Sequence, residues 1–227
     1  LPIWIATNMA HQVMGKPRSY NPGAFNNNML WQWATNNMDS EFWRARSADW
    51  SKTAVPFYSV GNWTGMGLHL RGNVEAFVNA ASKHKKLRIH SGSHFHPFHS
   101  NEGRLDQLRF FDHWLKGRDT GIMEEPPVKL MIRTGGGNAG SYQFRFEHEW
   151  PLARTQWTKF FLDANGSKLS TTPVAQATNV EYDATGSSVT FTTAPLAVDT
   201  EITGPMAAKL FVSSSTSDAD LFVIVRV

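Results

Sequence analysis

The passage that decides the fold runs from residue 55 to residue 94. It reads Val55-Pro56-Phe57-Tyr58-Ser59-Val60-Gly61-Asn62-Trp63, then Leu68-His69-Leu70-Arg71-Gly72-Asn73-Val74-Glu75-Ala76-Phe77, then Leu87-Arg88-Ile89-His90-Ser91-Gly92-Ser93-His94. The first and third runs predict buried strands, and the second predicts a helix between them. Because strands separated by a helix pair in parallel, the passage predicts an α/β sheet whose second strand leads into a histidine-bearing loop.

The regions on either side of this passage have different compositions. Gly103–Lys116 has leucine and phenylalanine at helical spacing and is followed by Gly117, which predicts a helix and its end. Residues 1–50 are rich in Met, Trp and Asn, and we expect a mostly helical cap there. The composition changes at Glu124-Glu125-Pro126-Pro127, which predicts a domain boundary.

Beyond that boundary, short apolar runs alternate with turn signals and show no helical period, as is typical of a β-sandwich. The expected strands are Val128–Arg133, Thr158–Leu162, Val189–Thr193, Ala208–Ser213 and Leu221–Val227. The predicted division is therefore a cap over 1–50, part of an α/β domain over 51–123, and a β-sandwich over 124–227. The chain starts without Met and stops inside an apolar run, so we expect truncation at both ends.

Composition excludes several classes of function. A formal charge of +3 spread along 227 residues gives no sign of nucleic-acid binding, and we interpret Lys83–Lys86 as a solvated helix end. The absence of cysteine excludes disulfides and thiolate chemistry. No apolar run is long enough for a membrane span. We therefore expect neither nucleic acid nor a membrane among the partners, and no cofactor.

Several motifs in the second half of the chain resemble the cocaine esterase / X-Pro dipeptidyl-peptidase family (CocE/NonD hydrolases). They are Arg109-Phe110-Phe111-Asp112-His113-Trp114-Leu115-Lys116-Gly117, Glu149-Trp150-Pro151-Leu152-Ala153-Arg154-Thr155 and Thr200-Glu201-Ile202-Thr203-Gly204-Pro205. The resemblance implies an α/β-hydrolase with an inserted helical cap, followed by a jelly-roll-like, galactose-binding-like domain. It also implies hydrolysis of small-molecule esters, amides or X-Pro peptides by a Ser–Asp–His triad.

In this family pattern the triad histidine ends the loop after the last sheet strand, and here it is His94. It would take the proton of the serine hydroxyl and pass it to the leaving group. The chain contains no G-x-S-x-G elbow, so we expect the nucleophile in a missing N-terminal half, and we expect this chain alone to be inactive. We expect the acyl group of the substrate near Trp63.

The triad acid departs from the family pattern. The family usually has Gly-Gly-Trp-x-Asp after the preceding strand, whereas this chain has Gly61-Asn62-Trp63-Thr64-Gly65, with glycine at the aspartate position. Glu75, Glu102 and Asp106 are candidates to replace the missing carboxylate. The identity of the acid stays open, as does formation of a homo-oligomer.

Two alternatives give the same residues other functions. His90, His94, His96 and His99 have a spacing that suits a metal-binding hydrolase, although only Glu102 lies close by in the sequence to complete such a site. The β-sandwich could alternatively act as a non-catalytic binding module, with exposed aromatic side chains on one face.

Overall fold

The computed structural model describes residues 32, 35–63, 69–92, 95–134, 142–217 and 219–226. The chain divides into two units, Leu1–Asp49 and Trp50–Val227. Most of the expected cap, residues 1–31 with 33 and 34, lies outside the described residues. The described part of the first unit contains a one-turn helix, α3 (Glu41–Arg44), and the Trp43 Nε1 group donates a hydrogen bond to the carbonyl of Asn36 at 2.6 Å.

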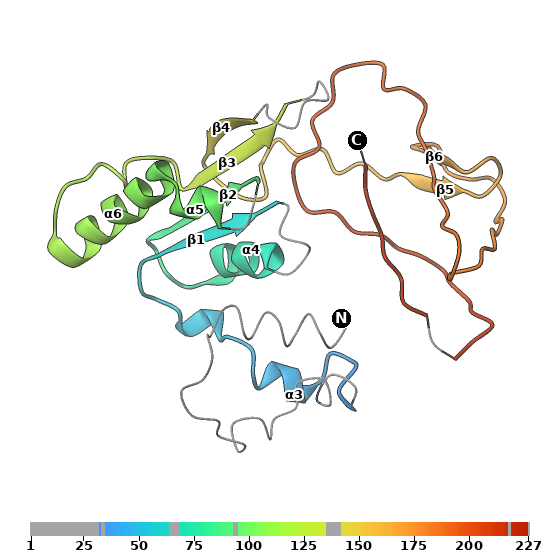
Figure 1. Ribbon diagram of the computed structural model, residues 1–227, viewed down its shortest axis with the longest axis horizontal. Coiled ribbons are helices and arrows are strands. Elements are labelled where there is room, and N and C mark those ends of the chain that lie inside the picture. The colour runs from blue at the N-terminus through green and yellow to red at the C-terminus, as the bar shows by residue number, and fades with distance from the viewer. Residues whose placement is uncertain are drawn as a thin grey trace. The chain divides into compact units, whose positions relative to one another are not determined.

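A four-stranded mixed sheet forms the centre of the second unit (Figure 1). Its spatial order is β1 (Phe57–Asn62), β2 (Lys85–His90), β3 (Val128–Arg133) and β4 (Tyr142–Glu147). The first three strands run parallel, and β4 runs antiparallel to β3. The predicted parallel pair and the α/β class are therefore confirmed.

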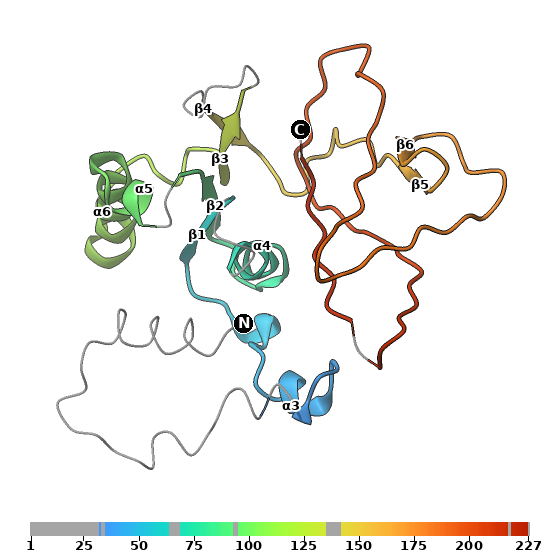
Figure 2. The same ribbon diagram turned by 45° about the vertical axis from the view of Figure 1, so that its right-hand side comes forward.

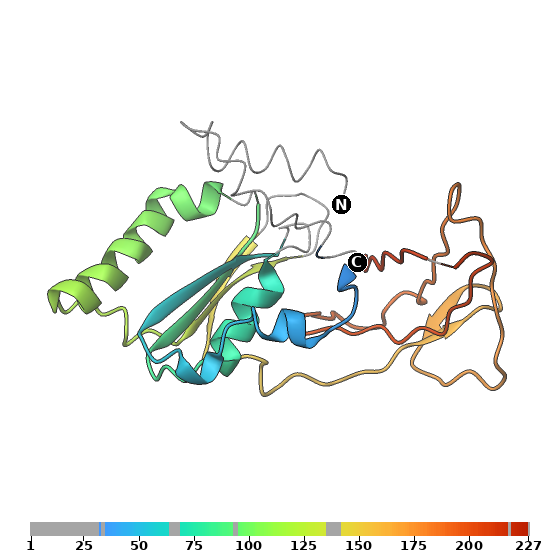
Figure 3. The same cartoon turned by 90° about the horizontal axis from the view of Figure 1, so that it is seen from below.

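Helices cover both faces of this sheet. Figure 2 places α4 (Leu70–Asn79) on one side and α6 (Asn101–Lys116) on the other, and Figure 3 looks onto α4 with the sheet behind it. The short elements η2 (Trp50–Lys52) and α5 (His96–His99) precede β1 and α6, respectively. None of the described helices has the length and apolar character needed to cross a membrane.

The ends of α6 follow from local sequence signals. The Ser100 side chain accepts a hydrogen bond from the backbone N–H of Gly103 at 3.2 Å, which caps the first turn. Gly117 has a left-handed φ of 63°, which ends the helix where the sequence predicted. The helical periodicity of its leucines, however, belongs to an outward face, because Leu105, Leu108 and Leu115 are exposed.

The apolar core lies between the sheet and α4. Successive strand residues point to opposite faces, so Leu87 and Ile89 of β2 join Val128 and Leu130 of β3 on one face, and all four are fully buried. They pack with Phe77, Trp150 and Leu152. The opposite face of β2 carries Lys86 and Arg88.

The structure differs from the predicted division at residue 124. We expected Val128–Arg133 in a separate sandwich, but Leu87 pairs with Val128 and Ile89 with Leu130, so β3 continues the α/β sheet and brings β4 with it. Aliphatic runs of this kind suit either a sandwich or a buried parallel strand, and only the pairing partner distinguishes them.

Residues 148–226 contain one described hairpin, β5 (Phe161–Asp163) with β6 (Lys168–Ser170), and an isolated bridge between Lys168 and Thr192. Gly166, with a φ of 78°, lies in the turn between the two strands. The hairpin overlaps one expected strand, and the bridge falls in another. The jelly-roll arrangement over 124–227 stays a prediction.

Candidate functional site

The carboxyl ends of β1, β2 and β3 meet at one edge of the sheet because the three strands run parallel. Ligands of open α/β sheets bind in the crevice outside this edge. The residues that follow the strands here are Trp63 after β1 and Ser91 and Gly92 after β2. This edge is the candidate active site.

Asn62 and His90 lie side by side at the ends of β1 and β2. They are partners in the parallel register and are 3% and 2% exposed, respectively. The Asn62 Nδ2 atom is 3.3 Å from His90 Nδ1, and it donates to the carbonyl oxygen of Gly92 at 3.1 Å. The Asn62 side chain at the end of β1 thus holds the start of the loop that follows β2.

Side chains also join this edge across the three strands. The Trp63 backbone N–H donates to the His90 carbonyl at 2.9 Å, and its indole Nε1 donates to the Met131 carbonyl on β3 at 2.9 Å. The Ser91 N–H donates to the Met131 sulfur at 3.3 Å. Trp63 is half-buried, and its ring lies 6.1 Å from that of Trp150. These contacts hold Trp63 at the edge where we expected the acyl group.

Two of the predicted triad positions, His94 and Gly65, lie outside the described residues, so their roles stay predictions. Among the residues that the structure describes, no three His, Cys, Asp or Glu side chains come close enough to hold a metal ion. Of the four histidines in the metal alternative, His90 is buried in the sheet and His99 is exposed on α5, while the His96 side chain is outside the description.

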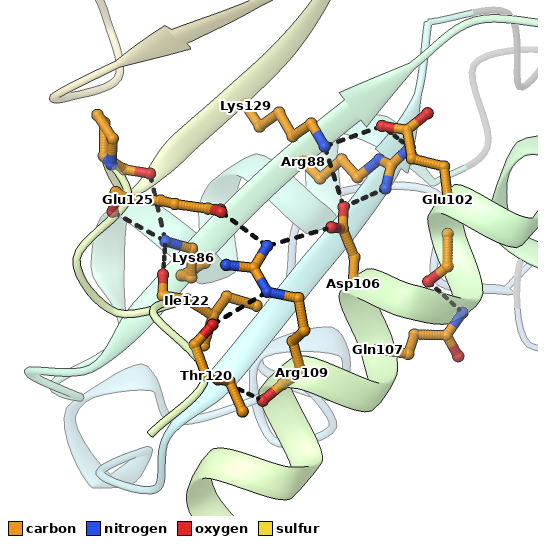
Figure 4. A network of polar contacts seen from close by, with 12 residues as sticks. Lys86, Arg88, Glu102, Asp106, Gln107, Arg109, Thr120, Ile122, Glu125 and Lys129 are labelled. Atoms are coloured by element: carbon orange, nitrogen blue, oxygen red, sulfur yellow. Dashed lines mark hydrogen bonds and ion pairs between the residues drawn. The ribbon is translucent and has the colours of Figure 1, made fainter. Parts of the chain in front are cut away.

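The three carboxylates considered as a replacement acid all contact other groups. On α4, Glu75 accepts a hydrogen bond from Asn79 at 2.8 Å and lies 3.9 Å from Arg71. Glu102 and Asp106 belong to a cluster of charges between α6 and the sheet (Figure 4). All three candidate carboxylates thus form ion pairs or hydrogen bonds with other side chains.

We call that cluster the α6 charge network and define it as Arg88, Lys129, Glu102, Asp106 and Arg109. Lys129 Nζ lies 2.9 Å from Glu102 and 3.2 Å from Asp106, and Arg88 forms an ion pair with Asp106. Arg88 is 3% exposed and the Asp106 side chain 9%. Because buried charges require partners, the network attaches α6 to the polar face of the sheet.

A buried lysine next to the network holds the segment between α6 and β3. Lys86 Nζ donates to the carbonyls of Ile122 at 2.7 Å, Glu125 at 3.0 Å and Pro126 at 3.3 Å (Figure 4). Burial lowers the pKa of Lys86 because it disfavours the charged form. Our interpretation of Lys83–Lys86 as a solvated helix end is wrong for Lys86, which is 3% exposed.

The same segment is also fixed from α6. Arg109 Nη1 pairs with the Glu125 carboxylate at 2.7 Å, and its Nε donates to the Thr120 carbonyl at 3.2 Å. The Thr120 hydroxyl returns a hydrogen bond to the carbonyl of Arg109 at 2.9 Å. These side chains set the path along which the chain passes from α6 into β3.

Two of the family-like motifs meet in a second ion-pair network. Arg145 on β4 binds Glu201 through two contacts of 2.7 Å, and Arg154 binds the buried Glu147. The hydrogen bonds from Arg145 lower the pKa of Glu201 to about 2. Arg154 and Glu201, from the Glu149–Thr155 and Thr200–Pro205 motifs, therefore join distant parts of the second unit.

Sequence reasoning missed Asn62 and the two buried cations Lys86 and Arg88 as structural residues. The alternation Lys86-Leu87-Arg88-Ile89 does carry a signal, because a strand with basic and aliphatic residues in turn has one polar face. For Asn62 the signal is its replacement of a glycine in the Gly-Gly-Trp-x-Asp pattern.

Residues 120–226 match the X-Pro dipeptidyl-peptidase C-terminal non-catalytic domain. Two curated proteins provisionally named serine esterases, from Mycobacterium bovis and Mycobacterium tuberculosis, are 24% identical over 80% of this chain and 33% of their own length. The chain thus spans about a third of the curated relatives it matches.

Two solved structures of a CocE/NonD family hydrolase from Staphylococcus aureus have the same fold. One superposes with a TM-score of 0.61 at 24% identity, covering 66% of this chain and 26% of that one. The other gives 0.62 at 21% identity, covering 76% and 30%. The structure and these matches together show a chain of the α/β class. The matches support a resemblance of the chain to the C-terminal part of CocE/NonD family hydrolases.

Proposed function

We propose that this chain provides the histidine loop and the C-terminal β region of a serine hydrolase that cleaves carboxylic esters or related acyl bonds, X-Pro peptide bonds included. The observation that carries the proposal is the carboxyl edge of the parallel strands. There the loop containing His94 leaves directly from the buried end of β2, beside the end of β1. A histidine loop in this place suits general acid–base catalysis at the mouth of the sheet.

In the proposed reaction His94 accepts the proton of a serine hydroxyl as the serine attacks the substrate carbonyl. The imidazolium then gives this proton to the leaving alcohol or amine. The chain contains no G-x-S-x-G, so the serine comes from sequence that this chain does not contain. Trp63, held by Met131 at the same edge, lies beside the substrate's acyl group.

The test uses the full-length hydrolase with a p-nitrophenyl ester. His94→Ala should abolish turnover and leave the thermal unfolding midpoint unchanged. The matched control is His99→Ala, which removes an exposed histidine from α5, five residues further along the chain. Turnover that survives in His94→Ala would exclude the role of this histidine.

The 227-residue chain alone should show no ester turnover, because the nucleophile is not in it. Turnover that a serine-directed inhibitor abolishes would contradict this assignment. Metal analysis of the same sample tests the alternative metal-binding function, and stoichiometric zinc or iron would favour that function over the serine mechanism.

A further inference from the structure

Asn62 is a buried polar side chain at the carboxyl edge that the proposed reaction does not use. In the family pattern glycine stands at its position, so the amide is a departure of this chain from that pattern. Its Nδ2 atom contacts the Gly92 carbonyl at 3.1 Å and His90 Nδ1 at 3.3 Å. An amide nitrogen carries two hydrogens, so it can donate to both.

The Gly92 carbonyl fixes the orientation of this amide, because an amide oxygen turned toward that carbonyl would be repelled. With Nδ2 facing His90, a hydrogen bond from Asn62 requires Nδ1 to accept, with the His90 proton on Nε2. The Ser91 carbonyl also lies 3.3 Å from His90 Nδ1 and would favour the other tautomer. The tautomer of His90 therefore distinguishes the two contacts.

Gly92 is the point at which the loop changes direction. Its φ of 86° lies in the left-handed region, and its carbonyl is the one that Asn62 holds. Just before it, Ser91 is held by the Met131 sulfur on β3. His94 follows two residues after Gly92. The loop thus leaves the sheet from a short segment that neighbouring strands hold on both sides.

We propose that Asn62 is a positioning residue. Its amide, held between His90 Nδ1 and the Gly92 carbonyl, sets the direction in which the loop carrying His94 leaves β2. This role rests on the proposed function, since it acts through His94. Displacing a general base by about 1 Å can cost about 100-fold in rate, so loss of this amide should lower kcat without weakening substrate binding.

Steady-state kinetics of the full-length hydrolase test the role. Asn62→Ala should lower kcat by about 100-fold with KM unchanged. The matched control is Asn73→Ala. The Asn73 amide also makes two hydrogen bonds to β1, to Ser59 Oγ at 3.2 Å and to the Val60 carbonyl at 3.1 Å, but it lies on α4. This control should lose similar stability and keep kcat. Equal kcat in the two variants would overturn the proposal.

Two measurements on the 227-residue chain need no activity. The imidazole ¹⁵N spectrum should show an unprotonated Nδ1 at His90, and Asn62→Ala should speed amide exchange at Gly92 while Asn73→Ala does not. A protonated Nδ1, or unchanged exchange in Asn62→Ala, would overturn the proposal even in an active enzyme. If Asn62→Ala fails to fold, Asn62→Asp keeps its shape, removes both donors and should speed the same exchange.

Absence of turnover in the unsubstituted full-length protein would instead remove the proposed function, and the catalytic role of Asn62 with it. The spectrum and the exchange rates would still decide whether Asn62 holds the loop. The two failures are therefore distinguishable.

Discussion

At the scale of single residues, two basic side chains of β2 are buried and are stabilised by different partners. Arg88 pairs with the carboxylate of Asp106, whereas Lys86 is held by three backbone carbonyls, with the Glu125 carboxylate nearby as a source of Coulomb attraction. The carbonyl oxygens carry partial negative charges that face the ammonium group, so the hydrogen bonds of Lys86 are satisfied without a direct ion pair. Buried Lys86 therefore holds the segment before β3 in place through these hydrogen bonds.

Lys86→Met should lower the free energy of unfolding by about 1–3 kcal/mol, because it leaves buried carbonyls without their donor. Methionine keeps most of the volume of the lysine side chain, so the loss measures the hydrogen bonds more than the packing. Lys83→Met, at an exposed position three residues earlier, should change stability by less than about 0.5 kcal/mol. Urea unfolding measures the stability of both variants, and equal losses would show that Lys86 does not hold the segment before β3.

Gly92→Ala tests the left-handed turn after β2. A Cβ there would approach only Pro97, at 3.8 Å, so the cost is conformational and not steric. We expect a loss of about 1 kcal/mol. Gly72→Ala in α4, where a Cβ meets nothing within 4 Å, should raise stability by up to about 1 kcal/mol. A Gly92→Ala variant at least as stable as the unsubstituted chain in urea unfolding would show that the turn does not require glycine.

At the scale of elements, α6 contacts the sheet mainly through charge on one face, while its leucines face outward. Phe110 is the buried apolar residue on the sheet side, and its ring lies 5.7 Å from that of Tyr58. Burial raises the pKa of Tyr58, so this phenol stays neutral. The position of α6 therefore depends on the α6 charge network as much as on apolar packing.

Asp106→Asn should destabilise the protein by about 3 kcal/mol, since it removes the buried carboxylate and leaves Arg88 and Lys129 with only the half-exposed Glu102. The control Glu75→Gln removes an exposed carboxylate from α4, where the ion pair with Arg71 contributes less than about 1 kcal/mol. Thermal or urea unfolding of the two variants compares them directly. A cost for Asp106→Asn as small as that of the control would show that α6 does not depend on the network.

At the scale of the second unit, the network of Arg145, Glu147, Arg154 and Glu201 links β4 to a segment more than fifty residues further along the chain. The hydrogen bonds from Arg145 hold the pKa of Glu201 at about 2, below the ordinary 4.5. A lowered carboxylate pKa stabilises the fold above the unfolded value. That contribution is complete above pH 4.5 and is lost as the pH falls toward 2.

Glu201→Gln should therefore flatten the fall of stability below pH 4.5, because glutamine does not titrate. Urea midpoints measured at several pH values down to about 2 should fall less steeply in this variant than in the unsubstituted chain. Glu124→Gln, at an exposed glutamate, should follow the unsubstituted curve. Identical slopes in all three proteins would exclude Glu201 as a source of the acid sensitivity.

The sequence located much of the fold and the place of the site. The two buried runs predicted β1 and β2, Gly117 predicted the end of α6, and the order of these elements predicted a histidine loop after β2. It misplaced β3, whose aliphatic run fits a sandwich equally well, and it treated Lys86 as solvated. Hydrophobic periodicity depends only on neighbouring residues, so it can predict that a segment is a strand but not with which strand it pairs.

The sequence by itself therefore determined the local elements, the end of α6 and the resemblance to a family, because these depend on residues close together along the chain. Only the tertiary structure decided that β3 and β4 extend the parallel sheet, that buried Lys86 and Arg88 have partners, and that Asn62 meets His90 and Gly92. Apart from the pairing of β3 with β4, these contacts join residues between 18 and 41 positions apart, from Arg88 with Asp106 to Leu87 with Val128. Pairing over such separations is set by three-dimensional packing and charge compensation, which no local pattern records.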